Sequence, residues 1–171
     1  MENKIMKLLE KAYDYSQEEN YSQALQCYDQ VLKIDPNNVG ALVDKGATLQ
    51  NLGKLKTSIK FYDKALSIDP VNLDAQVNKG SALHSLGLFS QAIQCYDSAL
   101  KIDKKCAMAF AYKGLSLGEQ GKIKDALKYF KKALSIDKDY DVAKISKDVA
   151  LELLKSIKKE QQKLKDRKSV V

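Results

Sequence analysis

The residues with the most reactive side chains are few, and their spacing does not favour catalysis. His84 is the only histidine, and although Ser81 and Ser85 lie near it, no serine–histidine–acid arrangement is evident. The three cysteines (Cys27, Cys95 and Cys106) form no CxxC pair, so with one histidine they cannot assemble a zinc site. No GxxxxGKS/T or GxGxxG segment is present to hold a phosphate group. The sequence therefore predicts neither an enzyme nor a protein that binds a metal or cofactor.

The composition is that of an ordinary globular chain. The sequence has 171 residues, of which 44% are hydrophobic and 30% charged, and its formal net charge is +7. No apolar run approaches the ~20 residues that a membrane span needs. The first residues lack the charged and then apolar layout of a secretory signal. We therefore expect a cytoplasmic protein that does not enter a membrane.

The elements that position these residues follow a strict internal period. Residues of one type recur every 34 positions, and four consecutive segments cover 5–38, 39–72, 73–106 and 107–140 without an insertion. The recurring positions are Ala12, Gly46, Gly80 and Gly114; Tyr28, Tyr62, Tyr96 and Phe130; and Asp35, Asp69, Asp103 and Asp137.

Within each segment, the apolar spacing is helical on both sides of a turn. In the second segment, Leu42, Gly46 and Leu49 share one face, which is typical of an amphipathic helix. Glu19-Asn20, Gly53, Gly87 and Gly121 mark the turns, where glycine tolerates a positive φ. Asn38 and Asn72 are suited to cap the helix that follows. The pattern predicts a helix, a turn and a second helix, four times over.

This pattern resembles the tetratricopeptide repeat family, whose period is also 34 residues. The eight signature positions match in 24 of 32 cases over residues 5–140. One leucine position holds lysine in every segment, and we expect that row to face solvent; it consists of Lys11, Lys45, Lys79 and Lys113. The resemblance implies an all-α fold, a right-handed superhelical solenoid of antiparallel helix pairs.

The segments after residue 140 differ from the repeats. Residues 141–157 carry an apolar stripe at helical spacing, which favours a helix that caps the last repeat and completes a domain of residues 1–157. Residues 158–171 are basic, and we expect a frayed or disordered tail there. An acidic partner, nucleic acid, or the acidic first repeat of another copy are the alternatives for this tail; nucleic acid is disfavoured because residues 158–169 contain no aromatic residue.

The resemblance also implies a concave groove lined by the first helix of each repeat. Asn78 is then placed to contact the backbone of an extended peptide, and Asp44 and Asp74 favour a basic residue on the ligand. Each residue has the alternative of being an ordinary exposed position with no ligand. The candidate groove residues are Asp44, Asp74, Asn78, His84, Met108, Tyr112 and Leu115, of which Met108, Tyr112 and Leu115 are expected to form an apolar pocket.

One family function is excluded by the residues at the matching positions. Members that bind the acidic C-terminus of a chaperone hold its two carboxylates with lysine, arginine and asparagine. The matching positions here are Leu9, Tyr13, Asp44, Asp74 and Asn78, and an aspartate there repels a carboxylate. The interpretation is a protein-interaction scaffold that binds a peptide or partner segment in its groove. The alternatives are a self-associating structural module that forms homo-oligomers, or one module of a larger assembly.

Overall fold

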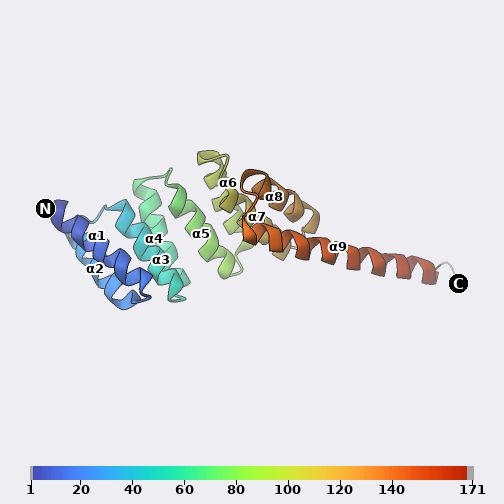
Figure 1. Cartoon of the computed structure of the whole chain (residues 1–171), viewed down its shortest axis with the longest axis horizontal. Coiled ribbons are helices and arrows are strands. Elements are labelled where there is room, and N and C mark those ends of the chain that lie inside the picture. The colour runs from blue at the N-terminus through green and yellow to red at the C-terminus, as the bar shows by residue number, and fades with distance from the viewer. Residues whose placement is uncertain (1, 169–171) are drawn as a thin grey trace. The chain divides into compact units, whose positions relative to one another are not determined.

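The computed structural model describes residues 2–168, with side chains from Glu2 to Lys163. The described chain is all-α and contains nine helices, of which α1–α8 form four pairs joined by short turns and α9 follows the last pair (Figure 1). Their bounds are α1 Glu2–Gln17, α2 Tyr21–Ile34, α3 Val39–Asn51, α4 Leu55–Ile68, α5 Leu73–Ser85, α6 Phe89–Ile102, α7 Ala107–Glu119, α8 Ile123–Ile136 and α9 Asp141–Lys168. None of these helices, over residues 2–168, is long and apolar enough to cross a membrane.

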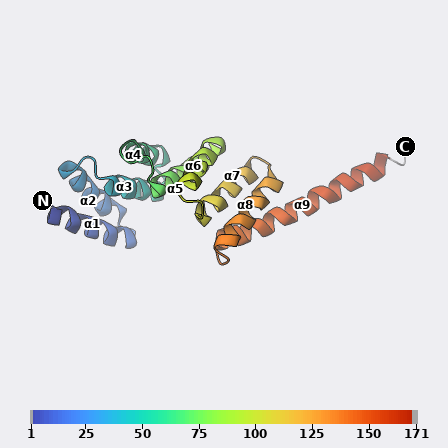
Figure 2. The same ribbon diagram turned by 90° about the horizontal axis from the view of Figure 1, so that it is seen from above.

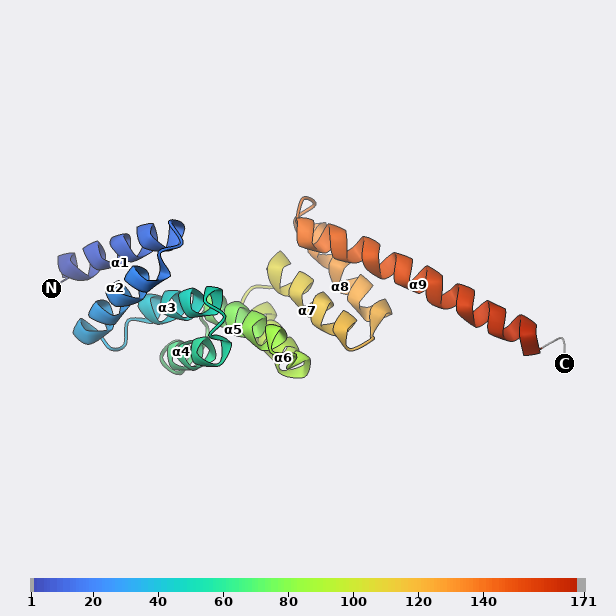
Figure 3. The same cartoon turned by 90° about the horizontal axis from the view of Figure 1, so that it is seen from below.

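The helices form two compact units, α1–α6 and α7–α9. In the first unit, α4 packs against both α3 and α5, and α3 also contacts α5, so the first helices of adjacent repeats lie side by side (Figure 2). In the second unit, α8 packs against α7 and α9, and α9 also contacts α7 (Figure 3). The start of α9 therefore packs against α7 and α8 in the same way as α5 packs against α3 and α4.

The turns inside the helix pairs adopt the predicted backbone conformation. Glu19 has a φ of 57°, and Gly53, Gly87 and Gly121 have values of 70°, 74° and 75°. No atom lies within 4 Å of a Cβ built on any of the three glycines, so their φ is the reason for glycine there.

The turns that follow the first and second repeats are closed by side-chain hydrogen bonds of an asparagine. The side chain of Asn38 accepts from the backbone N–H of Ala41 at 3.0 Å, which caps α3 as predicted. Asn38 also donates to Asp35 at 3.1 Å. The same two bonds recur one repeat later, from Ala75 to Asn72 at 3.0 Å and from Asn72 to Asp69 at 3.1 Å.

The small residues in the first helices permit close contact with the aromatic residue of the second. A Cβ added to Gly46 would lie 2.6 Å from Cε1 of Tyr62, and one added to Gly114 would lie 2.6 Å from Cε1 of Phe130. Tyr62 is fully buried. Glycine at these positions therefore allows the two helices of a repeat to approach closely.

Lys11 of the lysine row is exposed as expected, but Lys45 and Lys79 are not. The side chain of Lys45 is 14% exposed, because it passes between repeats to pair with Asp29 while its ammonium lies 4.4 Å from the ring centroid of Phe61. Lys79 is 26% exposed and pairs with Asp63 at 2.6 Å. The expectation was wrong for these residues because the partner carboxylate lies on the preceding repeat, 16 positions earlier in the chain.

The last helix does not end at residue 157, where the sequence placed the start of a frayed or disordered tail. α9 continues to Lys168, and in all three views it runs beyond α7 and α8. Ala143 and Ala150 are buried, whereas the described side chains from Lys158 to Lys163 are all exposed. The change at 157 is thus one of burial, while the helical backbone is continuous across it.

Candidate functional site

The first helices of the α1–α6 unit present a polar row across adjacent repeats. Asp44 on α3 and Asp74 on α5 are exposed, and Asn78 is half-buried one turn after Asp74. Burial of part of its surface raises the pKa of the Asp44 carboxyl, and the nearby negative charge of Asp74 raises that pKa further. The two carboxylates therefore repel each other.

A hydrogen-bonded chain lies next to this acidic pair. The hydroxyl of Tyr62 donates to the Gln50 amide oxygen at 3.0 Å, and the amide nitrogen of Gln50 donates to Ser81 at 3.1 Å. Ser81 belongs to α5, so the chain joins the first helices of two repeats. Burial raises the pKa of the Tyr62 hydroxyl, with the negative charge of Asp44 adding to the effect, so this group stays protonated as a donor.

His84 lies near the end of α5 and is half-buried. Its ring centroid is 5.3 Å from that of Phe89, in an edge-to-face arrangement. Among the residues that the structure describes, no group of three or more His, Cys, Asp or Glu side chains is placed to hold a metal ion.

The three apolar candidates of the fourth repeat differ in their surroundings. Met108 is 43% exposed on α7. Tyr112 is half-buried and hydrogen-bonds with Tyr140, whose pKa is raised to about 12, first by burial and then by the neighbouring Tyr112. Only Leu115 lines the apolar cavity of this unit.

That cavity lies between α7, α8 and α9 and has a volume of about 250 Å³. Gly118, Ala126 and Phe130 form its floor, and α9 supplies one wall. The α9 wall carries Ile145, Val149 and Leu153, which are 65%, 60% and 43% exposed. These three residues are spaced by four, so they form one apolar stripe along the helix.

At this cavity the fourth repeat lacks two polar groups that earlier repeats have. In the first repeat, Ser16 hydrogen-bonds with the hydroxyl of Tyr28, and in the second, Gln50 accepts from Tyr62. In both repeats the polar residue precedes the tyrosine by 12 positions, and the same spacing in the fourth repeat joins Gly118 to Phe130. The sequence contained this signal, but the groove prediction followed the Met108, Tyr112 and Leu115 positions and missed it.

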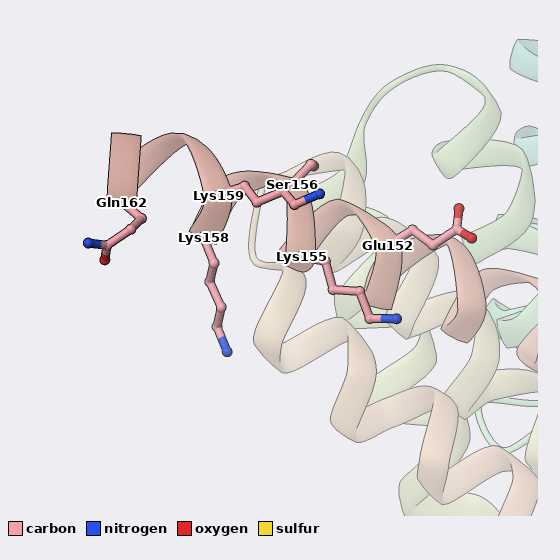
Figure 4. A pocket seen from close by; sticks show the side chains of 6 residues that line it. All are labelled: Glu152, Lys155, Ser156, Lys158, Lys159 and Gln162. Carbon is pink, nitrogen blue, oxygen red and sulfur yellow. The ribbon is translucent and has the colours of Figure 1, made fainter. Parts of the chain in front are cut away.

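A second hollow lies on the exposed part of α9. Figure 4 shows the side chains around it, Glu152, Lys155, Ser156, Lys158, Lys159 and Gln162. All six belong to one helix, so no second element encloses a ligand there. We interpret this region as a basic helix surface rather than a binding cavity.

Comparison with known proteins supports the repeat assignment directly. Residues 12–53 match the family described as TPR repeat, and residues 39–72, 73–106 and 107–140 match the family described as tetratricopeptide repeat. A search of curated proteins finds no match.

Several solved structures have the same fold at low sequence identity. A crystal structure of MamA is 24% identical, with a TM-score of 0.74 over 96% of both chains. PilF of Pseudomonas aeruginosa is 21% identical, with a TM-score of 0.83 over 94% of this chain and 73% of PilF. YrrB is 21% identical, with a TM-score of 0.72 over 80% of this chain and 71% of YrrB. The helix pairs, the glycine–aromatic contacts and the family matches together establish that this chain belongs to the tetratricopeptide repeat family.

Proposed function

We propose that this chain is a non-catalytic interaction module that binds an extended partner segment on the exposed faces of its first helices. Proteins of this repeat family serve as scaffolds for protein interactions. The observation that carries the proposal is the neighbouring pair of exposed carboxylates, Asp44 and Asp74. Neither forms an ion pair with another described residue, and their repulsion costs stability that a basic ligand would recover.

Asn78 and one solved relative add support to this proposal. Asn78 follows Asp74 by one turn and offers an amide donor and acceptor that suit a peptide backbone. YrrB, which has the same fold, is a repeat protein of this family with an unusual peptide-binding site. We propose a ligand with at least one Lys or Arg near the two aspartates, a class that differs from the acidic chaperone C-terminus.

The test is a selection of random peptides displayed on phage against the full chain, followed by affinity measurements on the enriched peptides. We expect enriched peptides to contain Lys or Arg, and the double variant Asp44→Lys with Asp74→Lys to weaken their binding by about tenfold or more. The matched control is Glu2→Lys with Glu18→Lys, which changes the net charge equally at exposed positions. Failure to enrich any peptide, or equal binding by both double variants, would overturn the proposal.

Self-association is the second candidate function. On α1, Met6 is 60% exposed and Tyr13, two helical turns later, is 62% exposed. Two exposed large apolar side chains this close together are unusual. A second copy of the chain is a partner that such a surface would suit. The molar mass in solution separates this candidate from the first. A cytoplasmic location and the lack of a nucleic-acid partner remain predictions from the sequence.

A further inference from the structure

We propose that the lysine-rich part of α9, from Lys155 to Lys163, binds an acidic segment of a partner protein. The carboxylates of that segment would be spaced along the helix as the lysines are. This inference goes beyond the proposed function, because it concerns another helix, outside the first-helix faces of the α1–α6 unit, and a ligand of the opposite charge.

The lysines of this surface have a regular spacing. Lys155, Lys159 and Lys163 follow one another every four positions, so they lie along one side of the helix, about 6 Å apart along its axis. Lys158 lies beside this row, and all four side chains are exposed. Figure 4 shows three of them, Lys155, Lys158 and Lys159, around the hollow described above. An acidic segment lying along the helix would meet several positive charges at once.

These positive charges are not neutralised by the chain itself. None of the four lysines forms an ion pair with a carboxylate of the described residues, whereas Lys144 on the same helix pairs with Asp139 at 3.0 Å. The hollow is lined by one carboxylate, that of Glu152, against three lysines. Like charges four positions apart on a helix repel each other. The carboxylates of a ligand would remove this repulsion, which is the charge complementarity that carries the proposal.

This part of α9 is accessible because it has left the repeats. The helix runs beyond α7 and α8, and every described side chain from Lys158 to Lys163 is exposed (Figures 1 and 3). A partner segment can therefore lie along the helix without displacing any other element of this unit.

The apolar residues of α9 argue against a membrane as the occupant. A helix that lies on a lipid surface needs an apolar face to enter it. Leu154 and Ile157 are half-buried and border a hollow with Gly121 and Ile123 of the α7–α8 turn, so they face the repeat. Residues 158–163 contain no apolar side chain. The lysine-rich part of α9 therefore offers charge without the apolar face that lipid binding requires.

Two features argue for a protein rather than a nucleic acid. Residues 158–169 contain no aromatic side chain on which a base could stack. The exposed carboxylates of Glu152 and Glu160 also interrupt the basic surface. A continuous row of phosphates would pass both glutamates, whereas a protein segment can place its carboxylates opposite the lysines alone.

The test measures the fluorescence anisotropy of two labelled, alanine-based helical peptides with the full chain. One peptide carries a glutamate at every fourth position, and the other carries glutamine at the same positions. We expect the glutamate peptide to bind at about 20 mM salt, and the glutamine peptide to bind about tenfold more weakly or less. Raising the salt to about 300 mM should also weaken binding of the glutamate peptide by about tenfold, because the lysines are exposed.

Two triple variants locate the binding surface. Lys155→Gln with Lys159→Gln and Lys163→Gln should weaken binding of the glutamate peptide by about tenfold or more. The matched control makes the same change at three exposed lysines of α4 that also follow one another every four positions, Lys56, Lys60 and Lys64. The control lowers the net charge equally and should change binding by less than about twofold. Thermal melts of both variants should match that of the unchanged chain, because all six side chains are exposed.

Several outcomes would overturn the inference. Equal weakening by the two triple variants would show that the peptide responds only to net charge, and no binding of the glutamate peptide would exclude the site. A DNA duplex or phosphatidylserine vesicles whose binding is lost in the α9 variant, while the glutamate peptide still binds, would identify a different occupant. The α9 variant should keep its affinity for the basic peptides expected from the proposed function, so the two proposals can fail independently.

Discussion

At the scale of single residues, the two glycines of α7 have opposite surroundings. A Cβ on Gly114 would lie 2.6 Å from Phe130 Cε1 and 3.2 Å from the backbone oxygen of Ala126, whereas one on Gly118 would meet nothing closer than 4.0 Å. Neither glycine has a positive φ. Packing therefore requires the first glycine, while the second is free to change without disturbing the helix pair.

This difference predicts opposite effects for the same substitution. Gly114→Ala should lower the free energy of unfolding by about 1–3 kcal/mol, because Phe130 must move away from the new methyl group. Gly118→Ala should leave stability unchanged or raise it by up to about 1 kcal/mol through helix propensity. Urea denaturation followed by circular dichroism measures both. A Gly114→Ala protein as stable as its Gly118→Ala counterpart would contradict the packing argument.

Asp44 gives a prediction about pH. The pKa of its carboxyl is raised in the folded chain above the ordinary value of an aspartate, first by burial and then by the charge of Asp74, so folding disfavours the charged form. Below the pKa of Asp44 in the unfolded chain, the carboxyl is protonated in both the folded and the unfolded state, so the charge does not lower stability. Above the raised pKa in the folded chain, the carboxyl is charged in both states, and the loss of stability is complete. Asp44→Asn should therefore stabilise the protein at pH 7 and have little effect at pH 3. Urea midpoints at the two pH values test this, and a larger gain at pH 3 would refute it.

Some residue-level properties were readable from the sequence and others were not. The cap by Asn38 and the turn at Gly53 depend on neighbours within a few positions, so local pattern was sufficient. The contacts of Lys45 depend on Asp29 of the preceding repeat, and a row of lysines on its own suggested exposure. The sequence named Asp44 and Asp74 as separate groove candidates, but their mutual repulsion was not predictable because they are 30 positions apart and so are not equivalent in the 34-residue period.

At the scale of elements, α9 combines two kinds of surface in one helix. Its start buries Ala143 and Ala150, while the described side chains from Lys158 onward are exposed. The sequence anticipated the capping stripe, but it did not reveal the cavity beside Ile145 and Val149. That outcome depends on which face of α9 meets α8 and on the missing side chain at Gly118, and neither is a property of α9 itself.

The division of α9 predicts where substitutions are tolerated. Ala150→Asp should lower the free energy of unfolding by more than about 2 kcal/mol, because it places an unpaired charge in a buried contact. Lys158→Glu, only eight residues later, should change stability by less than about 0.5 kcal/mol. Thermal melts of the two variants test this, and equal destabilisation would mean that the contacts of α9 with the repeats continue past residue 157.

At the scale of the whole molecule, net charge influences whether copies of the chain associate in solution. The net charge of +7 opposes association between copies, whereas the exposed Met6 and Tyr13 favour it. If partner binding is the function, the chain should be a monomer by light scattering at both low and high salt. A dimer that Met6→Glu and Tyr13→Glu abolish would instead support self-association, and dissociation by salt would show that charge drives it.

The closed turns of this chain affect how the number of its repeats can change in evolution. Each of the turns Asp35–Asn38 and Asp69–Asn72 is held by a hydrogen bond within its own repeat. At the two junctions between repeats, the same kind of ion pair forms, from Lys45 to Asp29 and from Lys79 to Asp63. An in-frame duplication of residues 39–72 would carry its own turn, its own cap and both halves of its glycine–tyrosine contact. The gene can therefore gain or lose whole 34-residue units by unequal recombination, and near-identical stretches such as 24–29 and 92–97 are where its copies would align.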